Sequence, residues 1–115
     1  MEIGNHSWSH QRMVLKSSGF YDEEIARTQE AVVAAGAPEP TLFRPPFGKK
    51  LLGVRRAVDR GGLTAVMWSV EDDLSGTLTP QEYADRIVAE AEPASIILMH
   101  VMYPSSQIAR DALPL

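Results

Sequence analysis

Residues 41–48 read TLFRPPFG, a short apolar strand pattern that runs into two consecutive prolines. Leu42 and Phe43 favour extended backbone, whereas the proline rings fix the following backbone and remove two hydrogen-bond donors. The segment therefore predicts a strand at residues 41–44 that leads into a rigid loop.

Helix and strand patterns alternate on both sides of this segment, which predicts an α/β fold. Apolar periodicity predicts helices at residues 22–35, 51–60, 80–91 and 105–113. The third has a capping-box spacing, Thr79 to Glu82, with proline at its first helical position. Apolar runs predict strands at residues 1–5, at 63–70, buried on both faces, and at 95–99, also buried. Four apolar residues of the second helix are predicted core contacts: Leu51, Leu52, Val54 and Val58.

The length of 115 residues suits one small domain and is too short for a closed eight-stranded α/β barrel of roughly 200 residues or more. Eleven Lys and Arg against fifteen Asp and Glu give a net charge of −4, which argues against a nucleic-acid partner. Cysteine is absent, so only His, Asp and Glu could ligate a metal. No apolar run approaches the ~18 residues of a membrane span, and no leader pattern opens the chain.

Polar side chains follow each predicted strand: His6 and His10 the first, Arg44 the second, residues 71–73 the third and His100 the fourth. In parallel α/β barrels, reactive groups gather at these strand ends. The pattern therefore predicts a common site, and nearly every reactive side chain of the chain falls within it.

Each of these residues has a functional and a structural interpretation. His6 and His10, one turn apart if their segment is helical, could share a divalent cation, or be ordinary core or surface histidines. Arg44 could orient a carboxylate or be a surface arginine before a turn. His100 could act as a general acid or be a hydrogen-bonded, half-buried histidine.

The acidic run Glu71-Asp72-Asp73 could orient His100 or be a solvated turn. Trp8 and Trp68 fit core or rim positions better than sugar-stacking platforms, although both lie beside reactive positions.

Four segments, in this order, resemble the motifs of the polysaccharide deacetylases with the NodB homology domain, carbohydrate esterase family 4. They are residues 2–10 (EIGNHSWSH), 44–48 (RPPFG), 68–71 (WSVE) and 97–100 (ILMH). The resemblance spans nearly the whole chain and implies a partial distorted (β/α) barrel. It also implies metal-dependent hydrolysis of the acetamide on N-acetylated amino sugars of a polysaccharide or oligosaccharide. The implied cofactor is a divalent metal ion, with zinc expected.

By the same resemblance, His6 and His10 correspond to the two histidine metal ligands of the family. Arg44 corresponds to the arginine that holds the catalytic-base aspartate, and the backbone N–H of Phe47 to an oxyanion donor. His100 corresponds to the general acid that protonates the leaving amine.

Leu98 is similar to the leucine that lines the acetate-methyl pocket, and Trp68 is predicted to bind substrate beside it. Among the acids before Leu74, Asp73 is the predicted catalytic residue that orients His100, with Glu71 and Asp72 as alternatives.

Two departures from the family pattern affect these expectations. The Thr-Phe-Asp-Asp motif, which supplies the base and the metal's aspartate, does not occur, and the usual Asp-x-x-Asp-Trp appears as EDDL at residues 71–74. We therefore expect residues 1–115 to be a single deacetylase-like domain, truncated at both ends and impaired in activity. Open sheet edges favour self-association.

Two other readings stay open at this point. One is a catalytically inactive carbohydrate- or metal-binding remnant, and the other is an α/β domain whose histidines are incidental. Family members often act at the cell envelope or outside the cell, and the sequence leaves location undetermined.

Overall fold

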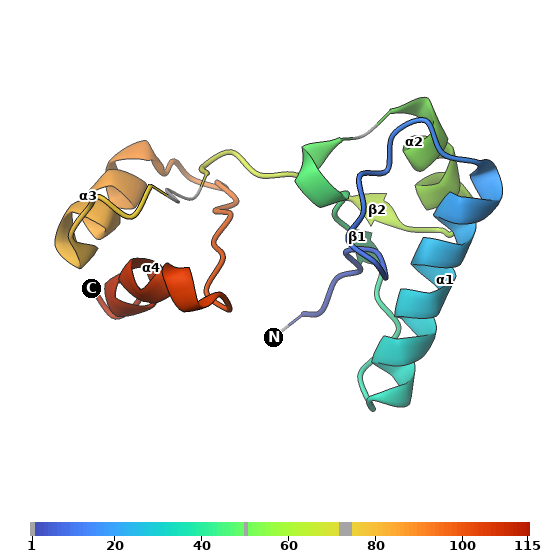
Figure 1. The fold of residues 1–115 in the computed structure, drawn as a ribbon, viewed down its shortest axis with the longest axis horizontal. Helices are drawn as coiled ribbons and strands as arrows, with labels where there is room; N and C mark the ends of the chain where they lie inside the picture. Colours follow the sequence, from blue (N-terminus) through green and yellow to red (C-terminus); the bar gives the residue numbers. More distant parts are fainter. Residues whose placement is uncertain (1, 50, 72–74) are drawn as a thin grey trace. The chain divides into compact units, whose positions relative to one another are not determined.

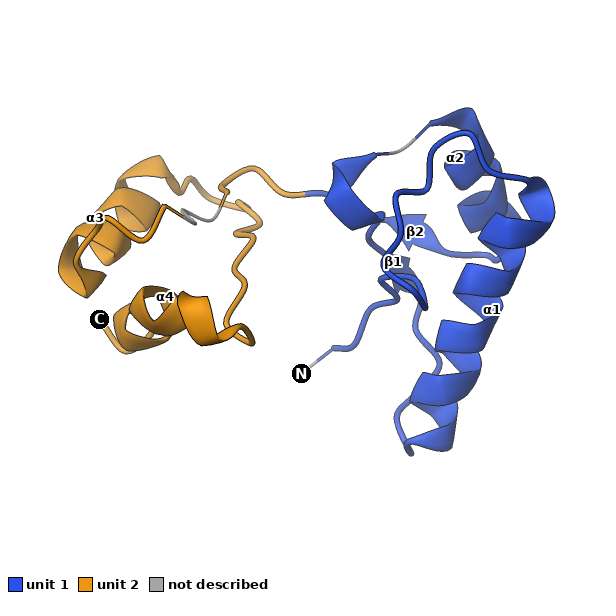
Figure 2. Ribbon diagram, viewed as in Figure 1, with its two compact units in different colours: residues 1–67 blue, residues 68–115 orange. Residues whose placement is uncertain are grey.

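Helices and short parallel strand segments alternate along the chain in the computed structural model, which describes residues 2–49, 51–71 and 75–115 (Figure 1). The chain divides into two compact units, Met1–Met67 and Trp68–Leu115 (Figure 2). Among the described residues, no helix is long and apolar enough to cross a membrane.

The first unit contains α1 (Ser18–Ala34), β1 (Leu42–Phe43), the 3-10 helix η1 (Pro46–Gly48), α2 (Leu52–Arg60) and β2 (Thr64–Ala65). β1 and β2 pair in parallel, with Phe43 opposite Ala65. Asn5 bridges Phe43 in parallel on the other edge of β1, because its N–H donates to the Leu42 carbonyl and its own carbonyl accepts from the Arg44 N–H. The end of the first predicted strand therefore lies beside β1.

The core of this unit lies between α1, α2 and β1. Phe43 and Met13 are fully buried, and six further residues complete the cluster: Tyr21, Ile25, Val54, Ala57, Val58 and Leu63. Leu51 and Leu52, predicted as core contacts, are instead exposed. They lie at the N-terminal end of α2, whereas the buried face of this helix consists of Val54, Ala57 and Val58.

Gly53 allows α2 to approach the ring of Tyr21. A Cβ at position 53 would lie 2.5 Å from Cε2 of this buried ring.

Glycine-to-alanine changes in helices usually stabilise by about 0.5–1 kcal/mol, whereas overpacking costs about 1–3 kcal/mol. We therefore expect Gly53→Ala to lower the free energy of unfolding in urea. Gly19→Ala is the matched control, because no neighbour lies within 4 Å of its Cβ position, and it should be neutral or stabilising. Equal effects of the two changes would contradict the close packing of Gly53.

The second unit contains α3 (Pro80–Glu90), η2 (Pro104–Ser106) and α4 (Gln107–Ala112). The predicted capping box of α3 is confirmed: the Thr79 hydroxyl accepts from the Glu82 N–H, and the Glu82 carboxylate accepts from the Thr79 N–H at 2.8 Å. The pKa of Glu82 is lowered, mainly by the hydrogen bond from the Thr79 backbone and further by the one from the Thr79 side chain. Tyr83 and Ile87 of α3 pack with Val70 and with Ala109 and Ala112 of α4.

The two long buried strands predicted from apolar runs are wrong in extent and burial. Only Thr64–Ala65 forms a strand within the first run, and both residues are exposed. In the second run, Ile97 makes a single parallel bridge to Val70, while Ile96 and Ile97 are 42% and 38% exposed. A strand is buried on both faces only when other layers cover both of its faces, and an apolar run cannot specify that cover.

The helix predictions hold better. α1 begins four residues before the predicted start, because the Ser17 hydroxyl accepts the Phe20 N–H at its N-terminus. The fourth predicted helix divides into the 3-10 turn η2 and the short helix α4.

Candidate functional site

His6 and His10 come together through a tight turn, not through a helix as their spacing suggested. Ser7 and His10 adopt left-handed backbone, with φ of 67° and 54°. The His10 N–H donates to the Ser7 hydroxyl at 3.1 Å. The imidazole rings meet edge-to-face with centroids 4.9 Å apart. The two histidines therefore lie close together, as their spacing suggested, but on a non-helical backbone, and their role as metal ligands stays a prediction.

The ring of His6 is oriented by the neighbouring strand end. Its Nδ1 lies 2.6 Å from the Arg44 carbonyl oxygen. A carbonyl can only accept, so Nδ1 carries the proton and the lone pair of the neutral ring is on Nε2. Metal-bound histidines commonly donate their second ring N–H in this way, which fixes the tautomer and the ring direction. The arrangement therefore suits His6 to ligate through Nε2.

Arg44 and Phe47 lie beside the turn that carries the two histidines, residues 6–10, called the histidine turn below. The half-buried Arg44 donates from a guanidinium nitrogen to the Met67 carbonyl at 3.4 Å. Phe47, within η1, has left-handed backbone with φ 58° and ψ 17°. Its exposed ring lies 5.0 Å from that of His10, and the guanidinium of Arg12 stands 5.3 Å from its centroid. Four of the predicted site residues thus gather in the first unit.

The donor set fits part of a divalent metal site. Two neutral imidazoles suit zinc and neighbouring first-row metals, but a zinc site usually has at least three protein ligands. Within residues 2–49, 51–71 and 75–115, no group of three His, Asp or Glu residues is placed to hold an ion. His6 and His10 would therefore be two ligands of a larger set.

Trp68, Leu98 and His100 belong to the second unit, and all three are half-buried. The Leu98 N–H donates to the Val70 carbonyl at 2.9 Å, and the ring of His100 stacks on Tyr103 with centroids 6.0 Å apart. Asp73 lies outside the described residues. Neighbouring Glu71 is exposed, and its carbonyl accepts from Arg86.

Sequence reasoning missed Glu24 and Asn5. Glu24 follows the exposed acids Asp22 and Glu23 on α1, yet it is only 6% exposed. Asn5 is buried as well. Glu24 is three residues after the buried Tyr21 and next to Ile25, which is the spacing that could have indicated a carboxylate on the inner face of the helix.

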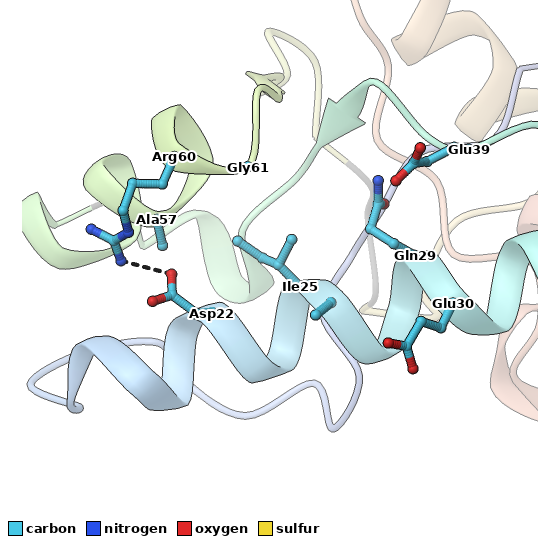
Figure 3. Close-up of a pocket in the computed structure, with 9 residues that line it drawn as sticks. Asp22, Ile25, Gln29, Glu30, Glu39, Ala57, Arg60 and Gly61 are labelled. Atoms are coloured by element: carbon cyan, nitrogen blue, oxygen red, sulfur yellow. Dashed lines mark hydrogen bonds and ion pairs between the residues drawn. The ribbon is translucent and has the colours of Figure 1, made fainter.

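A pocket of about 430 Å³ in the first unit contains none of the predicted site residues. It lies between α1 and α2, where Asp22 and Arg60 form an ion pair at 2.7 Å and Gln29, Glu30 and Glu39 line the other end (Figure 3). Because both partners of the pair are about half exposed, it contributes little stability. This pocket therefore does not coincide with the candidate site.

The fold and the site together define an α/β domain whose paired imidazoles and arginine follow the ends of parallel strand segments. The family model for polysaccharide deacetylase matches residues 1–66. The chain therefore belongs to the polysaccharide deacetylase family.

Three known proteins illustrate the similarity. A chitin deacetylase from Amylomyces rouxii is 32% identical over 97% of this chain and 30% of its own length. A family 4 acetyl xylan esterase from Clostridium thermocellum, solved in complex with a cobalt ion, is 28% identical with a TM-score of 0.87, over 98% of this chain and 54% of the solved one. A family 4 pseudoenzyme from Bacillus anthracis is 27% identical with a TM-score of 0.85, over 97% of this chain and 38% of the solved one.

These similarities confirm the predicted fold class, since the described structure corresponds to part of the family 4 deacetylase fold. The chain spans 15% and 30% of the length of two curated relatives that it matches.

Proposed function

We propose that this chain is part of a metal-dependent deacetylase that hydrolyses the acetamide of N-acetylated amino sugars in a polysaccharide or oligosaccharide. The observation that carries the proposal is the gathering of His6, His10, Arg44 and Phe47, with the His6 ring held by the Arg44 carbonyl. Membership of the deacetylase family and similarity to a chitin deacetylase support the substrate class.

His6 and His10 would hold a divalent ion, with zinc proposed and cobalt a natural probe because a similar solved structure contains it. When bound, such an ion polarises an amide carbonyl and acidifies water. Arg44 would orient a carboxylate base, for which its planar guanidinium is suited. The backbone N–H of Phe47 would stabilise the negative charge that develops on the amide oxygen.

His100 would return a proton to the leaving amine nitrogen, and Asp73 would orient its ring. Leu98 and Trp68 would enclose the acetyl group.

A second candidate function is a catalytically inactive carbohydrate- or metal-binding domain. It is favoured by the two-histidine donor set of the described residues. A similar fold occurs in a family 4 pseudoenzyme.

Acetate release from N-acetylated chitooligosaccharide, measured with and without added Zn²⁺ or Co²⁺, tests the proposal. We expect metal-dependent release that falls by about 10²- to 10⁴-fold in His100→Ala, the usual size of a general-acid contribution. Metal binding without release would favour the inactive domain. Release that is independent of metal and of His100 would contradict both the mechanism and the residue assignments.

A further inference from the structure

Glu24 is a buried carboxylate that the proposed mechanism does not use. The other acids of α1, including Asp22, Glu23 and Glu30, are exposed, whereas Glu24 lies on the buried face beside Tyr21 and Ile25. Burying a carboxylate is costly unless hydrogen bonds replace its water. The contacts of this side chain should therefore show what it does.

The Glu24 carboxylate is hydrogen-bonded to the backbone of the histidine turn. The backbone N–H of Ser9 donates to Glu24 Oε2 at 2.8 Å, a short charge-assisted hydrogen bond. Ser9 lies immediately before His10. The carboxylate of α1 thus holds the backbone of the segment that carries both imidazoles.

Asn5 holds the other end of the same turn. Its Oδ1 accepts from the Ser7 N–H at 3.0 Å, and its Nδ2 donates to the Ile25 carbonyl and to Gln29 Oε1, each at 2.9 Å. Two side chains therefore accept hydrogen bonds from backbone donors of the turn. Glu24, in α1, accepts from position 9, and Asn5, which is bonded to α1, accepts from position 7.

The turn needs such support, because Ser7 and His10 are both left-handed and neither is glycine. Left-handed backbone costs about 1–2 kcal/mol for each such residue. Without external hydrogen bonds the segment would relax toward extended or right-handed backbone, and the two rings would separate.

We propose that Glu24 is a positioning residue that fixes the Ser7–His10 turn, so that the His6 and His10 rings face the same point. This inference rests on the proposed function for its purpose, although the positioning itself can be tested without metal. Glu24 acts through the Ser9 amide and does not contact substrate.

The test compares Glu24→Ala and Glu24→Gln with wild type by NMR. In Glu24→Ala we expect hydrogen exchange of the Ser9 amide to accelerate by about 10- to 100-fold, and the nuclear Overhauser contact between the two imidazoles to disappear. Glu24→Gln retains an acceptor oxygen and should restore most of both signals. Glu30→Ala, an exposed acid of the same helix, is the matched control and should change neither.

If Glu24 had only a structural role, Glu24→Ala would lower the thermal stability but leave the Ser9 exchange and the ring contact of the folded molecule unchanged. That result would overturn the proposal. Equal effects of Glu30→Ala would also overturn it. If Glu24→Ala does not fold, the proposal fails unless Glu24→Gln keeps Ser9 protected.

Co²⁺ titration, followed through paramagnetic shifts of the His6 and His10 ring protons, adds the link to metal. We expect affinity to fall by about 10- to 100-fold in Glu24→Ala, the usual effect of removing an outer-shell support. If wild-type rings do not respond to Co²⁺, the proposed function fails, while Ser9 exchange still decides the positioning role.

Discussion

Changing both histidines to alanine, His6→Ala with His10→Ala, is expected to abolish specific binding of Zn²⁺ or Co²⁺. The two imidazole rings are the proposed metal ligands, and their centroids lie 4.9 Å apart. Loss of an outer-shell partner costs about 10- to 100-fold in metal affinity, so loss of both ligands should exceed about 100-fold. Metal content by mass spectrometry after dialysis, with calorimetric titration, measures the effect.

Both histidines are exposed, so the double change should leave the helical circular-dichroism signal intact. His100→Ala is the matched control: it removes a histidine of the second unit that is not proposed as a ligand, and it should keep wild-type metal content. Wild-type metal content in the double variant would show that other residues bind the ion and would remove the basis of the proposed site.

Phe43→Ala is expected to cause the largest loss of stability. Phe43 is fully buried at the centre of the first unit, in β1 between Asn5 and β2. Truncating a buried phenylalanine to alanine costs about 3–5 kcal/mol, a large share of the ~5–15 kcal/mol by which a domain is stable. Urea unfolding followed by Trp8 fluorescence in a Trp68→Phe background would measure the loss in the first unit.

Leu52→Ala is the matched control for this measurement. Leu52 is also apolar and was predicted to be in the core, but it is 72% exposed, so its loss should change stability by no more than about 0.5 kcal/mol. Comparable losses at the two positions would contradict the core described for this unit.

Local signals in the sequence predicted local structure well. Thr79, Pro80 and Glu82 specify the start of α3 because the capping hydrogen bonds join residues three apart. The prolines after Arg44 likewise end the strand, and β1 stops at Phe43, one residue before the predicted end. The four motifs in order indicated the family, which the match to residues 1–66 confirms. Self-association through open strand edges stays a prediction.

Predictions that depend on distant neighbours were less accurate. Leu52 and Val54 are equally apolar, yet only Val54 faces the core. Residues 63–70 had the composition of a buried strand, but only Thr64–Ala65 pair with β1, and Val70 makes an isolated bridge to Ile97. Composition describes what a segment could bury, whereas the packed neighbours decide what it does bury.

The sequence by itself determined the helices, the capping box and the strand before the double proline, while the roles of the reactive side chains stay a prediction. The tertiary structure alone decided that the two imidazoles meet through a left-handed turn, and that Glu24 is buried against the Ser9 N–H 15 positions away. The physical reason is that a cap or a periodicity is set by neighbours within one helical turn. A buried carboxylate and a strained turn are stable only when packing brings their hydrogen-bond partners together from distant parts of the chain.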